Sequence, residues 1–77
     1  MNILKVSAEL KSLGTVINNF RDKSKVNSKT KKELKNLGIQ CHQLSDKIIR
    51  DHADEGIAKD CFLEILNRFN QILLDEQ

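Results

Sequence analysis

The segment "ELKSLG" at residues 9–14 returns as "ELKNLG" at residues 33–38, an offset of 24 residues. The match extends to "ELKSLGTVINNFRDK" (9–23) and "ELKNLGIQCHQLSDK" (33–47), with seven of fifteen positions identical. In both copies apolar residues recur at steps of three and four, which predicts a helix with one apolar face. At about 100° per residue, an offset of 24 turns the second face about 120° from the first. A single long helix would therefore carry two unrelated apolar faces, so the repeat predicts two helices that pack against each other.

Apolar stripes of this kind occur three times along the chain. The first contains Ile3, Val6, Leu10, Leu13, Ile17 and Phe20. The second contains Leu34, Leu37, Cys41, Leu44 and Ile48. The third contains Ala58, Cys61, Phe62, Ile65, Leu66, Phe69, Ile72 and Leu73. Because the third stripe is wider than a heptad seam, it predicts a helix that packs on two neighbours.

The joins between the helices follow from polar segments and capping residues. Residues 21–32 contain Val26 as their one apolar residue. Thr30 and Glu33 have the spacing of a capping box, and Asp54 is a candidate N-cap for the third helix. We therefore predict an all-α protein with one domain at 1–77, a small antiparallel three-helix bundle. Its helices are expected at about 3–22, 31–52 and 55–74, and dimerisation of the bundle is an open alternative.

Each copy of the repeat holds one glycine, Gly14 or Gly38, inside its apolar stripe. A glycine in a helix interior costs about 1 kcal/mol relative to alanine, which indicates a compensating role for each. In an antiparallel hairpin, residues at one level have numbers that add to a constant. For these two glycines the turn would be centred on Val26, inside the polar segment. We expect the glycines to let the two backbones approach closely, and the alternative is that each ends its helix as a C-cap.

Composition places the chain among small globular domains. Of its 77 residues, 39% are hydrophobic and 31% charged, which is too apolar for a disordered chain. No apolar run reaches the length of a membrane span, and the first residues lack a signal-peptide pattern, so we expect a cytoplasmic protein that does not enter membranes. In that setting Cys41 and Cys61 are interpreted as reduced core thiols, with a disulfide or redox switch as the alternative.

The charge is unevenly distributed along the sequence. Residues 1–35 hold nine basic and three acidic residues, a net +6, whereas residues 36–77 hold four and eight, a net −4. The basic side chains between 21 and 32, in a predicted loop, are Arg21, Lys23, Lys25, Lys29, Lys31 and Lys32. They are candidates for contact with an anion or a nucleic acid. No aromatic residue is interleaved for base stacking, and a solvated loop is the alternative.

The sequence offers few groups for catalysis or metal binding. The possible thiol and imidazole ligands are Cys41, His42, His52 and Cys61, but their spacing is not that of known zinc motifs. A second polar group gathers at one helix end, and it contains Asp51, His52, Asp54 and Glu55. Groups this local more often cap and solubilise a helix than form an acid-base site. We therefore expect no enzymatic activity, no cofactor and no metal.

Apolar residues outside the stripes suggest a docking surface. Leu63 and Leu74 are eleven residues apart, so they project within about 20° of each other. Asn67 and Asn70 share this face, and we predict that these four residues bind a partner protein. Further residues outside the stripes are Leu4, Val16, Ile39 and Ile49.

The expected function is that of a small non-enzymatic protein-binding module, which acts as a regulator, adaptor or inhibitor by docking one helical face on a partner protein. The partner could be a second copy of the chain. One alternative is a nucleic-acid-associated regulator that uses the lysine-rich 21–32 loop. Another is a self-assembling structural or immunity-type bundle.

Overall fold

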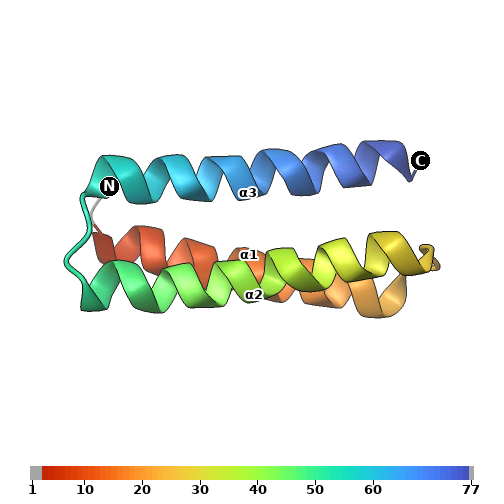
Figure 1. Ribbon diagram of the computed structural model, residues 1–77, viewed down its shortest axis with the longest axis horizontal. Helices are drawn as coiled ribbons and strands as arrows, with labels where there is room; N and C mark the ends of the chain where they lie inside the picture. Colours follow the sequence, from red (N-terminus) through yellow and green to blue (C-terminus); the bar gives the residue numbers. More distant parts are fainter. Residues whose placement is uncertain (1–2, 77) are drawn as a thin grey trace.

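Three long helices lie side by side in the computed structural model, which describes residues 3–76 and is 38 Å long. The helices are α1 (Ile3–Lys23), α2 (Ser28–Arg50) and α3 (Glu55–Asp75). Figure 1 shows α2 running antiparallel to α1, and α3 returning in the direction of α1. The predicted all-α three-helix bundle is confirmed. Residues 1, 2 and 77 of the predicted domain lie outside the described part of the chain.

The first join is shorter than the sequence suggested, because α2 begins at Ser28 and not at residue 31. Asn27 is its N-cap, and the Asn27 Oδ1 atom accepts a hydrogen bond from the backbone N–H of Thr30 at 2.8 Å. The predicted capping box was therefore wrong. Thr30 lies inside the first turn, where its hydroxyl donates to Glu76, the C-cap residue of α3, and Glu33 pairs with Arg68 of α3. Asparagine caps a helix at least as well as threonine, so the earlier residue takes the position.

The second join, residues 51–54, is closed by two different caps. At the end of α2, the N–H of Ala53 bonds the carbonyl of Ile48 at 3.0 Å and the N–H of His52 bonds that of Ile49 at 3.3 Å. His52 has a φ of 52°, so this is a Schellman motif with histidine where glycine is usual. Asp54 caps α3 as predicted, accepting from the N–H groups of Gly56 and Ile57.

The core forms where the three predicted stripes meet. Its buried apolar side chains are Val6, Leu10, Leu13, Ile17, Leu34, Leu37, Cys41, Ile48, Ala58, Ile65, Phe69 and Ile72. All of them belong to the predicted stripes. The remaining stripe residues are partly buried around this core, and α3 contributes most of them, as its wider stripe predicts.

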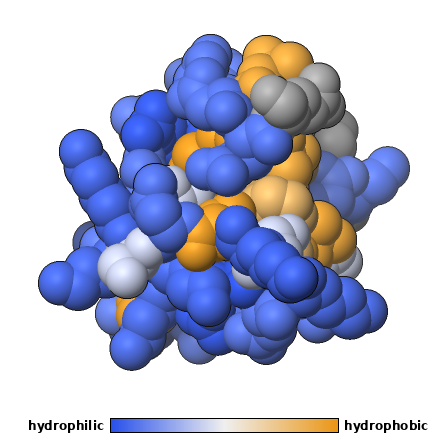
Figure 2. All heavy atoms as spheres, turned by 90° about the vertical axis from the view of Figure 1, so that its right-hand side faces the viewer, coloured by the Kyte–Doolittle hydropathy of each residue, from blue (hydrophilic) through white to orange (hydrophobic). Residues whose placement is uncertain are grey.

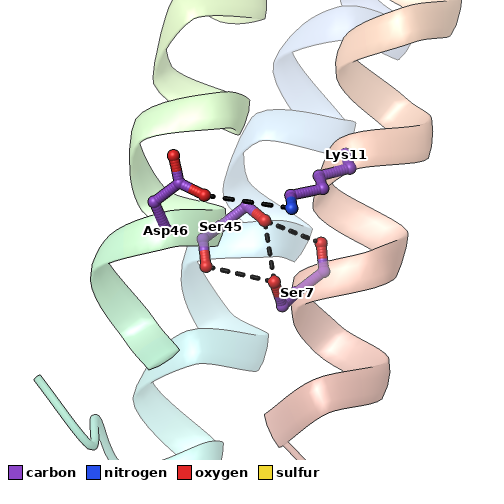
Figure 3. Close-up of polar contacts among 4 residues, drawn as sticks. All are labelled: Ser7, Lys11, Ser45 and Asp46. Carbon is purple, nitrogen blue, oxygen red and sulfur yellow. Dashed lines mark hydrogen bonds and ion pairs between the residues drawn. The ribbon is translucent and has the colours of Figure 1, made fainter. Parts of the chain in front are cut away.

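Small side chains bring α1 and α2 close together. Ser7 and Ser45 are buried, with their Oγ atoms 2.7 Å apart. Each hydroxyl also lies 3.1 Å from the backbone carbonyl of the other serine (Figure 3). Two hydroxyl protons serve these three contacts, so two hydrogen bonds form at any moment. On the surface above them, Lys11 and Asp46 form an exposed ion pair at 3.9 Å.

The two glycines continue this seam toward the middle of the hairpin. Both are buried inside their helices, so neither is a C-cap. A Cβ atom on Gly14 would lie 3.1 Å from Cβ of Cys41, and one on Gly38 would lie 2.6 Å from Oδ1 of Asn18. Real Cβ atoms rarely approach their neighbours this closely. Gly14 therefore lies against α2 as expected, whereas the space beside Gly38 is filled by the end of the Asn18 side chain.

Large side chains lie between α3 and the hairpin, and α1 and α2 each contact α3 much less extensively than they contact each other. The rings of Phe20 in α1 and Phe69 in α3 meet edge to face, with centroids 5.8 Å apart. Interaxial distance depends on the side chains at the contact, which here are rings instead of serine and glycine. The ion pair between Glu33 and Arg68 joins α3 to α2 on the surface.

Candidate functional site

The four predicted partner-binding residues lie together on the exposed side of α3. Leu63, Asn67, Asn70 and Leu74, hereafter the outer strip, all point away from the core formed by residues such as Ile65. Leu63 is 40% exposed and Leu74 is 62% exposed. The exposure of the outer strip agrees with the sequence prediction, while its binding of a partner stays a prediction.

Other large apolar side chains are exposed at scattered positions. They are Leu4, Val16, Ile39, Ile49 and Ile57. Sequence reasoning singled out all of these except Ile57, which lies in the first turn of α3 and was passed over because it precedes the stripe. Isolated exposed apolar residues are ordinary on protein surfaces. The outer strip differs because its two leucines share one helix face with only uncharged asparagines between them.

The predicted basic loop of residues 21–32 does not exist as a loop. Arg21 and Lys23 lie in the last turn of α1, and Lys29, Lys31 and Lys32 lie in the first turns of α2. Residues 24–27 form the actual link, which contains only Lys25 among the basic residues. The error has the same cause as the misplaced cap, because α2 begins three residues earlier than expected.

The helical arrangement brings together only some of the predicted basic residues. A surface hollow of about 360 Å³ is lined by Arg21, Ser28, Lys31, Lys32 and Lys35, hereafter the basic hollow. Lys35 was missed because it lies beyond the assumed loop. The signal was its position one helical turn after Lys31 within the predicted helix 31–52, which places both side chains on one face.

The remaining lysines of the segment are not part of this hollow. Lys25 instead lines a second hollow, of about 330 Å³, with Phe20, Val26 and Leu73. Figure 2 looks at this end of the bundle and shows apolar atoms in its middle, surrounded by hydrophilic side chains that project into solvent.

The basic hollow has little compensating negative charge. The Nε atom of Arg21 lies 3.3 Å from Oδ1 of Asp22, its neighbour in sequence. Among residues 3–76, no carboxylate lies within ion-pair distance of Lys31, Lys32 or Lys35. The carboxylate nearest in sequence, that of Glu33, turns to the other side of α2 to meet α3. The hollow also adjoins the N-terminus of α2, where the backbone carries a partial positive charge.

A shallow groove between α2 and α3 was not foreseen from the sequence. It has a volume of about 340 Å³, and it is lined by Leu37, Gln40, Leu44, Cys61, Glu64, Ile65 and Arg68. An adjoining hollow of about 240 Å³ shares Leu44 and Cys61 with this groove and extends toward Ile57. Sequence periodicity could not reveal the groove, because all of its apolar residues also belong to the core stripes.

The two cysteines differ in their surroundings. Cys41 is buried between α1 and α2, whereas Cys61 is partly exposed in the α2–α3 groove, and both are free thiols. Burial raises the pKa of the Cys41 thiol to about 11, because the thiolate would lose its hydration. Cys41 is therefore poorly suited to act as a nucleophile at neutral pH. Cys61 departs from the expected core position by lining the groove wall.

The groups considered for metal binding are spread over different places. His42 is an exposed residue against Gly14, and His52 lies in the link before α3. Within residues 3–76, no group of three or more His, Cys, Asp or Glu side chains is arranged to hold a metal ion. Over the same residues, no helix has the length and apolar character needed to span a bilayer.

Comparison of the chain with protein-family models, with curated proteins and with solved structures finds no match.

Proposed function

We propose that this chain is a small non-enzymatic protein-binding module, which acts as a regulator, adaptor or inhibitor by docking the outer strip of α3 on a partner protein. The observation that carries the proposal is the exposure of Leu63 and Leu74 on one face of a single helix, with no charge between them. Apolar side chains at helical spacing are what an amphipathic helix presents to a partner's groove.

The polar residues of the outer strip support the same proposal. Asn67 and Asn70 each offer two donors and an acceptor at the centre of the strip. Charged residues are depleted at the centres of protein interfaces, because their hydration is expensive to remove. On α3, Lys59 and Asp60 precede the strip, while Glu64 and Arg68 project about 100° and 140° away from Leu63, on neighbouring faces of the helix. The strip therefore has an apolar and hydrogen-bonding surface whose charges lie at its margin.

The order of side chains in the outer strip favours a second copy of the chain as one partner. The steps between its residues are four, three and four, so Leu, Asn, Asn, Leu reads the same from either end. Two antiparallel copies of α3 would place Leu63 against the partner's Leu74 and Asn67 against the partner's Asn70. Such self-complementarity is what a two-fold symmetric interface requires.

Affinity capture from the native cell tests the proposal directly. The bait is the full chain, and the test variant carries Leu63→Asp and Leu74→Asp. The control variant carries Leu4→Asp and Ile39→Asp, which add the same charge at exposed leucine and isoleucine positions on α1 and α2. We expect the test variant to lose proteins that the wild type and the control both retain.

Light scattering of the purified chain measures self-association in the same three samples. A wild-type dimer that dissociates in the test variant identifies the second copy as the partner. If the test variant retains every captured protein and the same molar mass as the wild type, the outer strip is not a docking surface and the proposal fails.

A further inference from the structure

We infer that the basic hollow binds the phosphate backbone of double-stranded nucleic acid without reading its sequence. This activity is separate from the docking proposed for α3, because the hollow is formed by α1 and α2. Its four cations are Arg21, Lys31, Lys32 and Lys35.

The first support is that the cations from two helices line one shallow surface hollow. Arg21 comes from the last turn of α1, and the three lysines come from the first two turns of α2. The fold thus brings together groups separated by ten residues of sequence. The four side chains therefore present their charge together on one open face at the turn between α1 and α2.

The second support is electrostatic. Lysines 31, 32 and 35 are exposed, and none has an ion-pair partner among the described residues. An anion that enters the hollow therefore need not displace an internal carboxylate from them. Condensed counterions released from nucleic acid make such contacts favourable at low salt.

The residue types argue for duplex backbone and against single strands. Proteins that bind single strands present aromatic rings on which bases stack. This chain has no Trp or Tyr, and its three rings, Phe20, Phe62 and Phe69, are all partly or fully buried. Three of the four cations are lysines, which act as point charges and lack the planar fork that arginine uses to read guanine. Binding through this hollow is therefore expected to ignore base sequence.

Fluorescence anisotropy with a labelled 20-base-pair DNA duplex tests the inference in the full-length chain. Four phosphate contacts give a slope of log K against log salt of about −3.6, so binding should tighten about 50-fold between 150 and 50 mM salt. The variant with Lys31→Gln, Lys32→Gln and Lys35→Gln keeps one cation, so its slope should fall to about −0.9. A second duplex of unrelated sequence should bind within about twofold of the first.

A matched control separates the hollow from the overall charge. The variant with Lys47→Gln, Arg50→Gln and Lys59→Gln loses the same three charges at exposed positions of α2 and α3. It should keep the wild-type slope, and circular dichroism should show that both variants are folded. Equal weakening in the two variants would mean general attraction to a polyanion and would overturn the inference.

Two further probes decide the kind of ligand. Single-stranded DNA of the same length and vesicles containing anionic lipid should both bind more weakly than the duplex. Tighter binding to either, or no binding to the duplex at 50 mM salt, overturns the assignment to duplex backbone.

Discussion

Replacing Gly14 by alanine would place a methyl group 3.0 Å from Nε2 of His42 and 3.1 Å from Cβ of Cys41. The His42 side chain is exposed and can rotate away. The Cβ atom of Cys41 is fixed to the backbone of α2, so relief requires the two helices to separate by a few tenths of an ångström. That movement would also loosen the buried packing around Cys41.

The change in the free energy of unfolding caused by Gly14→Ala follows from two opposed effects. Alanine in place of glycine stabilises a helix interior by about 1 kcal/mol. Overpacking a well-packed site typically costs about 1–3 kcal/mol. We therefore expect Gly14→Ala to lower the free energy of unfolding by about 1 kcal/mol. In a domain with about 5–15 kcal/mol of total stability, this is a measurable fraction.

Gly38 provides the matched comparison, because it lies on the same seam and differs in its neighbour. Its Cβ would meet Oδ1 of Asn18 at 2.6 Å, which is the end of a flexible, partly exposed side chain. Asn18 can move at low cost, so Gly38→Ala should leave stability unchanged or raise it by up to about 1 kcal/mol. The double variant Gly38→Ala, Asn18→Ala lacks the obstructing side chain and should show the full stabilisation of about 1 kcal/mol.

Urea unfolding followed by circular dichroism at 222 nm measures all three variants against the wild type. The reasoning requires Gly14→Ala to be less stable than Gly38→Ala. If both glycines could be replaced with an equal gain of about 1 kcal/mol, they would be ordinary helix positions, and the close approach of α1 and α2 would be refuted.

Three further predictions concern other features of the bundle. Ser45→Ala removes one of two buried hydrogen bonds, so it should lower the free energy of unfolding in urea by about 1 kcal/mol. The exposed Ser12→Ala should leave it unchanged, and equal effects of the two substitutions would mean that the buried serine pair does not stabilise the fold. His52 has a φ of 52°, so His52→Gly relieves a left-handed backbone conformation and should raise the free energy of unfolding, measured in urea, by about 1 kcal/mol. The pKa of the Cys41 thiol is raised from 9.0 to about 11 in the folded chain, so stability is unaffected below pH 9 and is lost as pH rises toward 11. Urea titrations of wild type and Cys41→Val across that range should diverge, and iodoacetamide at pH 8 should modify Cys61 well before Cys41.

Local patterns were enough to predict the three helices and the side of each that is buried. The steps of three and four that pass through Leu10, Leu34 and Ile65 place apolar groups on one face whatever the helices pack against. The cap at Asp54 was predictable for the same reason, since it depends on its immediate neighbours. The start of α2 was not, because Asn27 and Thr30 are both competent caps and the spacing of Thr30 and Glu33 also matches a capping box.

The seam between α1 and α2 was only partly predicted. The two glycines stand out in the sequence because a helix interior disfavours glycine, whereas nothing in the sequence distinguishes Ser7 and Ser45 from surface serines. Their numbers add to the same constant as those of Gly14 and Gly38, so the hairpin symmetry inferred from the glycines could have located them. Serines are common on helix surfaces, and only the close approach of two backbones buries this pair.

For the candidate sites, the sequence by itself determined which side of α3 carries Leu63 and Leu74, because helical periodicity fixes the direction of side chains on one helix. Only the tertiary structure decided the basic hollow and the α2–α3 groove. Arg21 lines the same hollow as Lys35 only because the chain reverses direction between α1 and α2. The groove lies between α2 and α3, which contact each other much less extensively than α1 and α2 do across their glycines and serines. Periodicity gives the direction of a side chain, and packing distances between helices depend on which side chains meet.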